Sequence, residues 1–564
     1  MKRLIECVPN FSEGNDMAVV RQITDEIESV DGVKLLDVDP GKATNRTVVT
    51  FVGEPEPVIE AAVRCVRKAA ELIDMSKHSG EHPRFGATDV CPLVPIAGVT
   101  MEETVEYAHT LAKRLGEEVG ITVFCYENAA RIEERRNLAV VRQGEYEGLK
   151  DRLADSRWKP DFGPATFNAR SGATAVSARD FLIAYNVNLN TTSTRRANAI
   201  AFDVREKGRV KRTGNPATGK VVLDADGNKV WTPGSLKSVK GIGWYIEEYG
   251  ICQISMNLTN IRVTSVHAAF DEVSAKAQAR GIRVTGSELV GLLPLDCLLD
   301  AGRHYLRKQS RSTGISDGEL IKIAVKSLGL DDLKPFVPEE RIIEYCIAAD
   351  SKEERLVDKS LEGFVLETAS ESAAPGGGSV AAALGALGAA LGTMVANLSS
   401  HKAGWDERWE EFSDWADKGK AHHSKLTYLV DEDTNAFNGI MAAFRLPGGT
   451  DEEKQARKDA IQAATRHAIE IPLQVMEAAL GSMEVIRAMA EHGQPSSISD
   501  AAVGALCARS AVLGAWLNVK VNVRDLQEQA VADEYLTRGQ AMAEDVERAE
   551  REVLEIVERV LAAG

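Results

Sequence analysis

Hydrophobic and polar residues follow two different patterns along this chain. Up to about residue 330, short apolar or alternating runs, which predict strands, are separated by segments whose apolar residues recur every three or four positions, which predict helices. From Leu361 onwards, the helical period continues with almost no strand-like alternation. The pattern therefore predicts an α/β half followed by an all-α half.

The α/β half divides into two subdomains. In the first, the strand-like run LIECVPN is followed by a helical segment from Met17 to Ser29, two further strands, a helix from Val58 to Ile73 and the strand VCPLVPI. This β-α-β-β-α-β order predicts a ferredoxin-like subdomain with extra elements over residues 1–178. The strand FLIAYNVNLN opens a second such subdomain over 179–330, so we expect a structural repeat.

Two segments interrupt or end this half. TGKVVLDADGNKVWTPG predicts a hairpin with its turn at Asp226–Gly227–Asn228, as a surface excursion within residues 207–238. Residues 331–357 contain two prolines and a charged run, which predict a linker. Residues 358–564 then predict a helical bundle, with helices over about 353–370, 379–398, 405–445, 451–480, 483–492, 499–524 and 528–561.

Composition excludes some classes of function. The chain has 564 residues, 44% hydrophobic and 27% charged, as in an ordinary globular protein. Its formal net charge of −17 argues against binding nucleic acid or an anionic membrane, because both need a basic surface. No secretory signal is visible, and the apolar segment from Val380 to Ala396 is short and weakly hydrophobic for a membrane span. We expect a close-packed helix there and no membrane insertion.

The eight cysteines and ten histidines show no metal-binding spacing. The cysteines form no C-x-x-C pair, and the histidines form no H-E-x-x-H motif. Several cysteines lie in apolar strand-like runs, as reduced core cysteines do. We therefore expect a cytoplasmic protein with free thiols and no metal.

The segment KHSGEHPRFGATDVCP, residues 77–92, concentrates polar side chains between a predicted helix and a predicted strand. It contains His78, His82 and Arg84, and its glycines and proline disfavour regular structure. A histidine in such a loop is suited to move protons near neutral pH. A hydrogen-bonded structural loop is an equally good interpretation of the spacing alone.

Two other segments are candidates to meet this loop. LLDVDPGKATNRT places Asp37 and Asp39 on one face of a strand, where either carboxylate can orient a histidine or be solvated. Residues 158–181 form a loop rich in Gly, Pro, Ala and Ser between the two subdomains. Its composition favours a plain connection, although crevices between such units often bind ligands.

These motifs together resemble the glutamate formiminotransferase family. The resemblance rests on ECVPNFSEG, LLDVDPGKATNRTVVTFVG, HSGEHPRFGATDVCPLVPI, KPDFGPATFNARSGA and KGIGWYIEE, and covers residues 1–330. It implies transfer of the formimino group of N-formimino-L-glutamate to N5 of tetrahydrofolate. It also implies that His82, in GEHPR, is catalytic. The implied folate-binding loop consists of Gly163, Pro164, Ala165, Thr166, Phe167, Asn168, Ala169, Arg170, Ser171 and Gly172.

Three further residues suit the implied transfer. We expect Asp39 to orient His82, and Arg46 and Arg84 to bind carboxylates of formiminoglutamate or folate, because guanidinium groups pair bidentately with carboxylates. Two arginines also supply the local positive charge that an acidic chain needs for anionic substrates. Compared with animal members, the 207–238 region is longer and the folate loop reads FNARSG, which affects its individual contacts.

The helical half contains three groups of candidate residues. APGGGS opens a predicted helix and leaves backbone N–H groups free at Gly377, Gly378 and Ser379 for an anion or a carbonyl oxygen. In LVDEDTNAF, Asp433 shares a helix face with apolar residues, while Asp431 and Glu432 are interpreted as solvated. Asn518 and Asn522 lie one turn apart and can either bind a pterin edge or bridge helices; their spacing favours bridging.

AAPGGGS, LVDEDTNAF, SDAAVGA and NVKVNVRDL resemble the formiminotetrahydrofolate cyclodeaminase/methenyltetrahydrofolate cyclohydrolase domain over residues 358–564. The resemblance implies that Asp433 is the cyclodeaminase acid and that the product is 5,10-methenyltetrahydrofolate. Fusion to a transferase favours cyclodeaminase, with ammonia release, over cyclohydrolase; a catalytically silent oligomerisation module is a further alternative. The expected partners are formiminoglutamate and polyglutamylated tetrahydrofolate, in a homo-oligomer formed through both halves.

Overall fold

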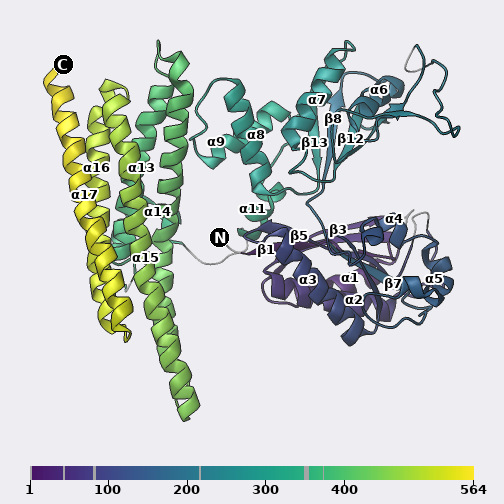
Figure 1. The fold of residues 1–564 in the computed structure, drawn as a ribbon, viewed down its shortest axis with the longest axis horizontal. Helices are drawn as coiled ribbons and strands as arrows, with labels where there is room; N and C mark the ends of the chain where they lie inside the picture. Colours follow the sequence, from purple (N-terminus) through teal and green to yellow (C-terminus); the bar gives the residue numbers. More distant parts are fainter. Residues whose placement is uncertain are drawn as a thin grey trace. The chain divides into compact units, whose positions relative to one another are not determined.

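The computed structural model describes residues 3–41, 45–80, 84–214, 218–348, 355–372 and 374–563. The chain forms two compact units. One contains residues 1–297 and 328–351, and the other contains residues 298–327 and 352–564. The first is an α/β unit and the second is helical, as the hydrophobic pattern predicts (Figure 1).

The first sheet of the α/β unit has seven strands in the described residues. They are β1 (Leu4–Cys7), β2 (Asn10–Phe11), β3 (Val33–Gly41), β4 (Arg46–Gly53), β5 (Thr88–Ala97), β6 (Thr122–Glu127) and β7 (Ala173–Ala178). β1 and β2 both lie between β4 and β5, with β3 outside β4, and all these pairings are antiparallel. β7 and β6 extend the sheet beyond β5 through parallel pairings.

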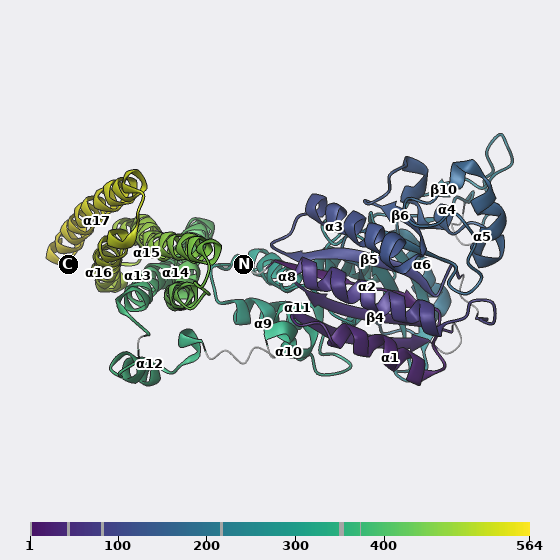
Figure 2. The ribbon, with the colours of Figure 1, turned by 90° about the horizontal axis from the view of Figure 1, so that it is seen from below.

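Helices cover both faces of this sheet. α1 (Met17–Glu28), α2 (Pro55–Leu72) and α3 (Met101–Arg114) pack their apolar sides on alternate strand residues such as Ile5, Cys7 and Phe51 (Figure 2). α4 (Leu138–Val141) and α5 (Glu145–Ala154) cover part of the other face, on Phe124 and Tyr126. The alternation of the two faces is that of a strand, whose successive side chains point to opposite sides.

The second sheet has four strands. They are β8 (Ile183–Leu189), β11 (Val239–Ile246), β12 (Ile251–Leu258) and β13 (Val284–Val290). The order is β11-β12-β8-β13, with all neighbours antiparallel. The helices α6 (Thr194–Val204) and α7 (Val266–Gln278) are inserted in chain order after β8 and β12. The elements therefore follow the same β-α-β-β-α-β order as the start of the first sheet.

The excursion between α6 and β11 forms a ribbon of β9 (Arg209–Val210) and β10 (Trp231–Thr232). Leu223 bridges to Lys229 around Gly227, whose φ is 82°, at the turn that the sequence predicts. Further along, part of the segment predicted as a linker is folded. It contains α10 (Pro338–Arg341) and α11 (Ile343–Ala348), where Ile342 and Ile343 are fully buried.

In the described residues, the helical unit contains α8 and α9, two short helices and five long ones. The helices are α8 (Leu295–Lys308), which begins at the unit boundary, α9 (Asp317–Leu328), α12 (Leu361–Thr368), η4 (Leu356–Asp358), α13 (Gly377–Ser400), α14 (Trp409–Phe444), α15 (Asp451–His492), α16 (Ile498–Asn522) and α17 (Gln529–Ala563). Short 3₁₀ helices in this unit are η5 (Asp406–Arg408), η6 (Pro495–Ser497) and η7 (Val523–Asp525). In the α/β unit, the short irregular helices of the described residues are the π-helix η1 (Leu115–Val119) and the 3₁₀ helices η2 (Glu133–Arg136) and η3 (Ser156–Trp158).

Helix α15 is continuous where the sequence predicts two helices that end and begin near Gly481. A Cβ at Gly481 would lie 2.6 Å from Cε1 of His422. The glycine therefore permits a close approach of α14 to α15 and does not end the helix. Gly388 has a similar role in α13, because its Cβ would lie 2.8 Å from the carbonyl oxygen of Gly504 in α16.

Two helices of the described chain, α13 and the stretch 495–525 around α16, are long and apolar enough to cross a membrane by length and composition. In α13, 56% of the apolar window is buried inside the bundle, and in the α16 stretch 44% is buried. Core helices of soluble proteins have the same properties, so this observation alone does not place the chain in a membrane.

Candidate functional sites

The loop that precedes β5 contains the motif with His78, His82 and Arg84, and the structure describes this loop up to residue 80 and again from residue 84. Glu81, His82 and Pro83 lie outside the described residues, so the structure gives no contacts for His82. His78 Nε2 lies 2.8 Å from the backbone oxygen of Asn45. Because a carbonyl oxygen can only accept, Nε2 carries the proton in this contact. His78 Nδ1 is then the acceptor for Arg84 Nη1, at 3.4 Å.

The predicted folate loop, residues 163–172, lies beside this segment. The backbone N–H of Met75 donates to the oxygen of Arg170 at 2.9 Å, and that of Ala87 donates to the oxygen of Ser171 at 2.8 Å. Gly172 has a φ of 64°, and a Cβ there would lie 2.5 Å from the oxygen of Phe85. The backbone of one loop thus fixes the other, and the sequence motifs containing Arg84 and Gly163–Gly172 lie side by side.

An aromatic pair lies at the surface of this site. The rings of Tyr146 and Phe167 are 5.5 Å apart, and the guanidinium of Arg84 lies 5.4 Å from the Tyr146 ring centroid. Tyr146 Oη donates to the oxygen of Ala169 at 2.5 Å, and Glu147 pairs with Arg84. Such a pair can stack on a flat ring. The sequence does not point to Tyr146 and Glu147, because nothing in GEYEG indicates contact with Ala169, 23 residues further along the chain.

Arg46 is held by protein groups. It donates to Asn10 Oδ1 from Nε and Nη2, at 3.1 and 2.9 Å, and forms an ion pair with the fully buried Asp89. Arg142 also pairs with Asp89, with Nε 3.0 Å from Oδ1. Burial lowers the pKa of Arg46 from its ordinary value. Two guanidinium groups on one carboxylate leave a net positive charge at this place, which is what an anionic substrate needs.

Asp39 lies in β3, opposite Val48 of β4, and its side chain is exposed. It raises the pKa of Asp37, although burial of Asp37 is the larger cause. The expected contact between Asp39 and His82 involves a residue outside the described ranges and stays a prediction. Ser171, at the end of the folate loop, has a buried Oγ with no hydrogen-bond partner among the described residues.

The second site lies at the start of α13. The Ser379 backbone N–H donates to Asp433 Oδ2 at 2.8 Å, and Ser379 Oγ donates to the same oxygen at 3.2 Å. A Cβ at Gly378 would lie 2.0 Å from Asp433 Oδ1, so any larger residue there would displace the Asp433 carboxylate. The helix N-terminus thus binds the Asp433 carboxylate, as its free N–H groups and dipole favour.

Asp433 is partly buried, and this burial raises its pKa. The two donors of Ser379 oppose the rise, because they stabilise the charged form. Asp431 differs from the sequence interpretation. It is half-buried, its Oδ1 accepts the Leu356 backbone N–H at 2.6 Å, and burial raises its pKa. It therefore fixes the chain before α12 and is not simply solvated.

The two asparagines reach the same site from α16. Asn518 Nδ2 donates to the oxygen of Gly514 in its own helix at 3.0 Å, and its amide lies near Gly377. Asn522 Nδ2 donates to the oxygen of Ala468 at 2.8 Å. Pro472 has no N–H to complete the usual helical bond to Ala468, so Asn522 supplies the missing donor. Asn522 therefore bridges two helices, as its spacing favours.

A cavity of about 150 Å³ joins these residues. It is lined by Ala374, Gly376, Gly377, Gly378, Asp433, Thr434, Ala436, Phe437, Ile440, Ala468, Asn518 and Asn522. Five residues chosen from the sequence line it, and Ser379 lies directly beside it. Ala468 was missed because only the fold brings α15 to this place.

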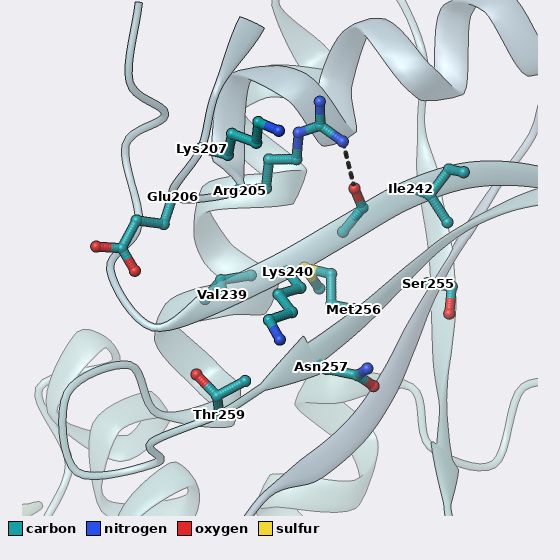
Figure 3. Close-up of a pocket in the computed structure, with 11 residues that line it drawn as sticks. Arg205, Glu206, Lys207, Val239, Lys240, Ile242, Ser255, Met256, Asn257 and Thr259 are labelled. Atoms are coloured by element: carbon teal, nitrogen blue, oxygen red, sulfur yellow. Dashed lines mark hydrogen bonds between the residues drawn. The ribbon is translucent and has the colours of Figure 1, made fainter. Parts of the chain in front are cut away.

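A larger cavity, of about 620 Å³, lies on the second sheet (Figure 3). Arg205, Lys207 and Lys240 line it, but Arg205 donates to the oxygens of Gly208 and Gly241, the latter at 3.3 Å. It contains none of the residues chosen from the sequence. Among the described residues, no group of three or more His, Cys, Asp or Glu side chains is placed to hold a metal ion.

Three segments of the chain match family models. Residues 4–179 match the N-terminal subdomain of the formiminotransferase domain, and residues 184–348 match the formiminotransferase domain. Residues 360–541 match formiminotransferase-cyclodeaminase. The two formiminotransferase matches thus cover the first candidate site, and the formiminotransferase-cyclodeaminase match covers the second.

Known proteins resemble the whole chain or one of its two halves in sequence. The chain is 43% identical to formimidoyltransferase-cyclodeaminase of Mus musculus, over 94% of each protein. It is 41% identical to glutamate formimidoyltransferase of Thermoplasma acidophilum, over 57% of this chain and 96% of that protein. It is 35% identical to methenyltetrahydrofolate cyclohydrolase of Methylorubrum extorquens, over 32% of this chain and 86% of that protein. On the near full-length match, this chain belongs to the formimidoyltransferase-cyclodeaminase family.

Proposed function

We propose that the chain transfers the formimino group of N-formimino-L-glutamate to N5 of tetrahydrofolate and then cyclises the product to 5,10-methenyltetrahydrofolate, releasing ammonia. The observation that carries the proposal is the second site. A partly buried carboxyl group with a raised pKa lies against a glycine-rich helix start in a cavity, within a chain whose family joins both activities. We also propose that this activity serves histidine degradation and one-carbon metabolism.

In the transfer, N5 attacks the amidine carbon, and the tetrahedral intermediate loses the proton of N5 and returns one to the departing glutamate nitrogen. His82 is proposed to carry out both proton transfers, since one imidazole can act as base and then as acid. Asp39 orients it, Arg46 and Arg84 attract the carboxylates, and residues 163–172 hold the folate. The joined loops and the positive cluster at Asp89 support these roles.

In the cyclisation, N10 attacks the formimino carbon, a C–N bond forms, and the bond to the exocyclic nitrogen breaks. The formimino group reacts as its amidinium cation, so the proton that N10 loses is the one that converts the departing amino group to ammonia, and the positive charge stays on the methenyl ring. Asp433 is proposed to give its proton to the leaving group and to regain one from N10. A carboxyl group kept partly protonated by burial suits this task. Gly377, Gly378, Ser379, Asn518 and Asn522 hold the ring.

The similarity to a cyclohydrolase supports a second candidate for the helical unit, namely hydrolysis of methenyltetrahydrofolate. Ammonia distinguishes the candidates, because only the cyclodeaminase produces it. A third candidate for the helical unit is an oligomerisation module without catalytic activity. In that case Asp433→Asn has no effect on the rate of cyclisation.

The test follows methenyltetrahydrofolate and ammonia separately after formiminoglutamate and tetrahydrofolate are mixed with the full-length enzyme. We expect His82→Ala to abolish transfer and to leave cyclisation of added 5-formiminotetrahydrofolate intact. Asp433→Asn should lower ammonia release by about a hundredfold or more with transfer unchanged, the size of a lost general acid. Ammonia release that survives in Asp433→Asn overturns the assignment of the second site.

We further infer the organisation that this function uses. Residues 1–178 and 179–330 are proposed as ferredoxin-like subdomains, of which residues 298–327 group with the helical unit. They are followed by a connecting segment at 331–357, which is partly folded as α10 and α11, and by the catalytic bundle at 358–564. The strand orders β5-β1-β4-β3 and β13-β8-β12-β11, with antiparallel neighbours, support two related subdomains. We also propose a cytoplasmic homo-oligomer that uses polyglutamylated folate, needs no metal and does not insert into membranes; exposed apolar residues such as Leu387 and Leu517 support the association of copies.

A further inference from the structure

A stripe of apolar side chains leads away from Asp433 along α14. Phe437, Ile440, Met441 and Phe444 follow Asp433 at spacings of three and four residues, so all five lie on one face of the helix. Phe437 and Ile440 line the cavity beside Asp433, and the side chains of Met441 and Phe444 are 40% and 48% exposed. The face thus remains open from the cavity to the end of α14.

A second stripe leads from the same cavity along α15. Ala468 lines the cavity, and Ile461 and Lys454 precede it by exactly one and two heptads, with Arg457 and Lys458 between them on the same face. A further cavity, of about 240 Å³, is lined by Lys454, Arg457, Lys458, Ile461, Gln462 and Gln527. We call Lys454, Arg457 and Lys458 the basic stripe.

The two stripes run in the same direction from Asp433. The loop 445–450 joins α14 to α15, so the helices run antiparallel as packed neighbours. Moving from the Asp433 cavity towards this loop, α14 presents aromatic and apolar side chains while α15 presents cations. From the rise of 1.5 Å per residue, Ile461 lies about 10 Å from Ala468 along the axis, Arg457 about 16 Å and Lys454 about 21 Å.

The charges of the basic stripe are only partly neutralised. Lys454 Nζ lies 2.9 Å from Asp451 of the same turn. Arg457 and Lys458 have no carboxylate within ion-pair distance among the described residues, and the neighbouring Glu528 is paired with Arg466. In a chain with a net charge of −17, two unneutralised cations beside a cavity favour an anionic ligand.

We propose that the basic stripe binds the glutamyl carboxylates of the folate whose ring lies beside Asp433, and that Phe437 and its apolar neighbours contact the benzoyl group between ring and tail. This rests on the proposed function of the second site. A folate presents a ring, then an aromatic group, then carboxylates, which is the order of polar cavity, apolar stripe and basic stripe. Because Arg457 and Lys454 lie farthest from the cavity, they act mainly on glutamates added beyond the first.

The test measures ammonia release by the full-length enzyme from added 5-formiminotetrahydrofolate with one or five glutamates. The variant is Arg457→Gln/Lys458→Gln; Lys458 is exposed and Arg457 is partly exposed, so both positions tolerate a neutral side chain. We expect KM for the pentaglutamate to rise about tenfold, as two lost charge-assisted contacts predict, with kcat unchanged and a much smaller effect on the monoglutamate. Raising the salt concentration should reduce the wild-type preference for the longer tail.

The matched control is Arg551→Gln/Arg559→Gln, which removes two exposed positive charges of α17 that have no carboxylate at ion-pair distance among the described residues. It should leave the ratio of the two KM values unchanged. Equal KM ratios in the wild type and in Arg457→Gln/Lys458→Gln overturn the proposal, as does an equal loss of affinity in the control. If the proposed function itself fails, the wild type releases no ammonia from either substrate, so the two failures are distinguishable.

Discussion

Asp433 has neighbours with opposite effects on its pKa. Burial raises the pKa, while the Ser379 backbone N–H and hydroxyl lower it. A proton donor is active in its acid form, so the rate of ammonia release should fall as the pH rises through the pKa. The serine therefore helps to set the pH range in which the second site works.

Ser379→Ala removes the hydroxyl donor and keeps the backbone N–H. We expect the pKa of Asp433 to rise further, and the falling limb of the pH–rate profile for ammonia release to move to higher pH. The measurement is kcat against pH for both activities, with formimino transfer as the internal control. An unchanged limb would contradict the role of the hydroxyl, and a matching shift in transfer would indicate a general effect.

Glu6 is a second buried carboxyl group, on the face of β1 opposite Ile5 and Cys7. Burial raises its pKa from 4.5 to about 7, against the attraction of Arg179. Between these values the unfolded chain loses a proton that the folded chain keeps, so the free energy of unfolding falls as the pH rises. The contribution is full below pH 4.5 and lost by about pH 7.

Glu6→Gln keeps the shape and removes this titration. The stability of the variant relative to the wild type should increase from pH 4.5 to 7 by up to about 3 kcal/mol, the equivalent of the pKa shift. Denaturant unfolding at several pH values measures this difference. Glu28→Gln, at an exposed position of α1, is the control and should show no such trend. A constant difference for Glu6→Gln across this range would sink the interpretation.

The sequence predicts the position of a side chain well where that position depends only on residues of the same helix or strand. Asp433 was chosen from its spacing to Ala436 and Phe437 on one helix face, and it lies in the cavity with them. Arg46 was chosen for its charge, but its pairing with Asp89 and the participation of Arg142 depend on strand and loop positions that no local pattern contains.

At the scale of elements, the strand and helix order of the α/β unit and the long helices of the bundle are predictable, because each depends on a local period. The boundaries in α15 are not. Gly481 resembles a helix end in the sequence, and Pro472 resembles a break, yet the helix passes through both. Contacts with His422 in α14 and Asn522 in α16 decide these positions.

The bond from Asn522 to Ala468 gives an element-scale prediction. Asn522→Ala leaves the Ala468 carbonyl without a donor and should lower the free energy of unfolding by about 1–3 kcal/mol. Pro472→Ala restores a backbone N–H to the same carbonyl, so Asn522→Ala should cost less in that background. A double-mutant cycle by denaturant unfolding measures the coupling. Asn518→Ala, whose amide bonds within its own helix, is the control; additive effects of the Asn522 and Pro472 changes would refute the link.

At the scale of the whole chain, the compact units do not follow the family segments. The formiminotransferase match extends to residue 348, yet residues 298–327 belong to the helical unit. Thr313 donates to Asp417 of α14, and Asn397 of α13 donates to the oxygen of Gly314 at 2.9 Å. The segment that precedes α9 therefore packs on α13 and α14 and contributes to the free energy of unfolding of the bundle.

A substitution at Gly314 can show whether the two compact units unfold independently of each other. A Cβ there would lie 2.4 Å from the Ala416 backbone carbon of α14, so Gly314→Ala should destabilise the helical unit by about 1–3 kcal/mol, the usual cost of overpacking. Gly318→Ala is the matched control in α9, since its added Cβ meets open space. Because the contact lies within the helical unit, ammonia release should be lost at a lower denaturant concentration in Gly314→Ala while formimino transfer is lost at the wild-type concentration. If both activities of Gly314→Ala are lost together at a lower concentration, the two units unfold as one, and the assignment of residues 298–327 to an independently stable bundle is wrong.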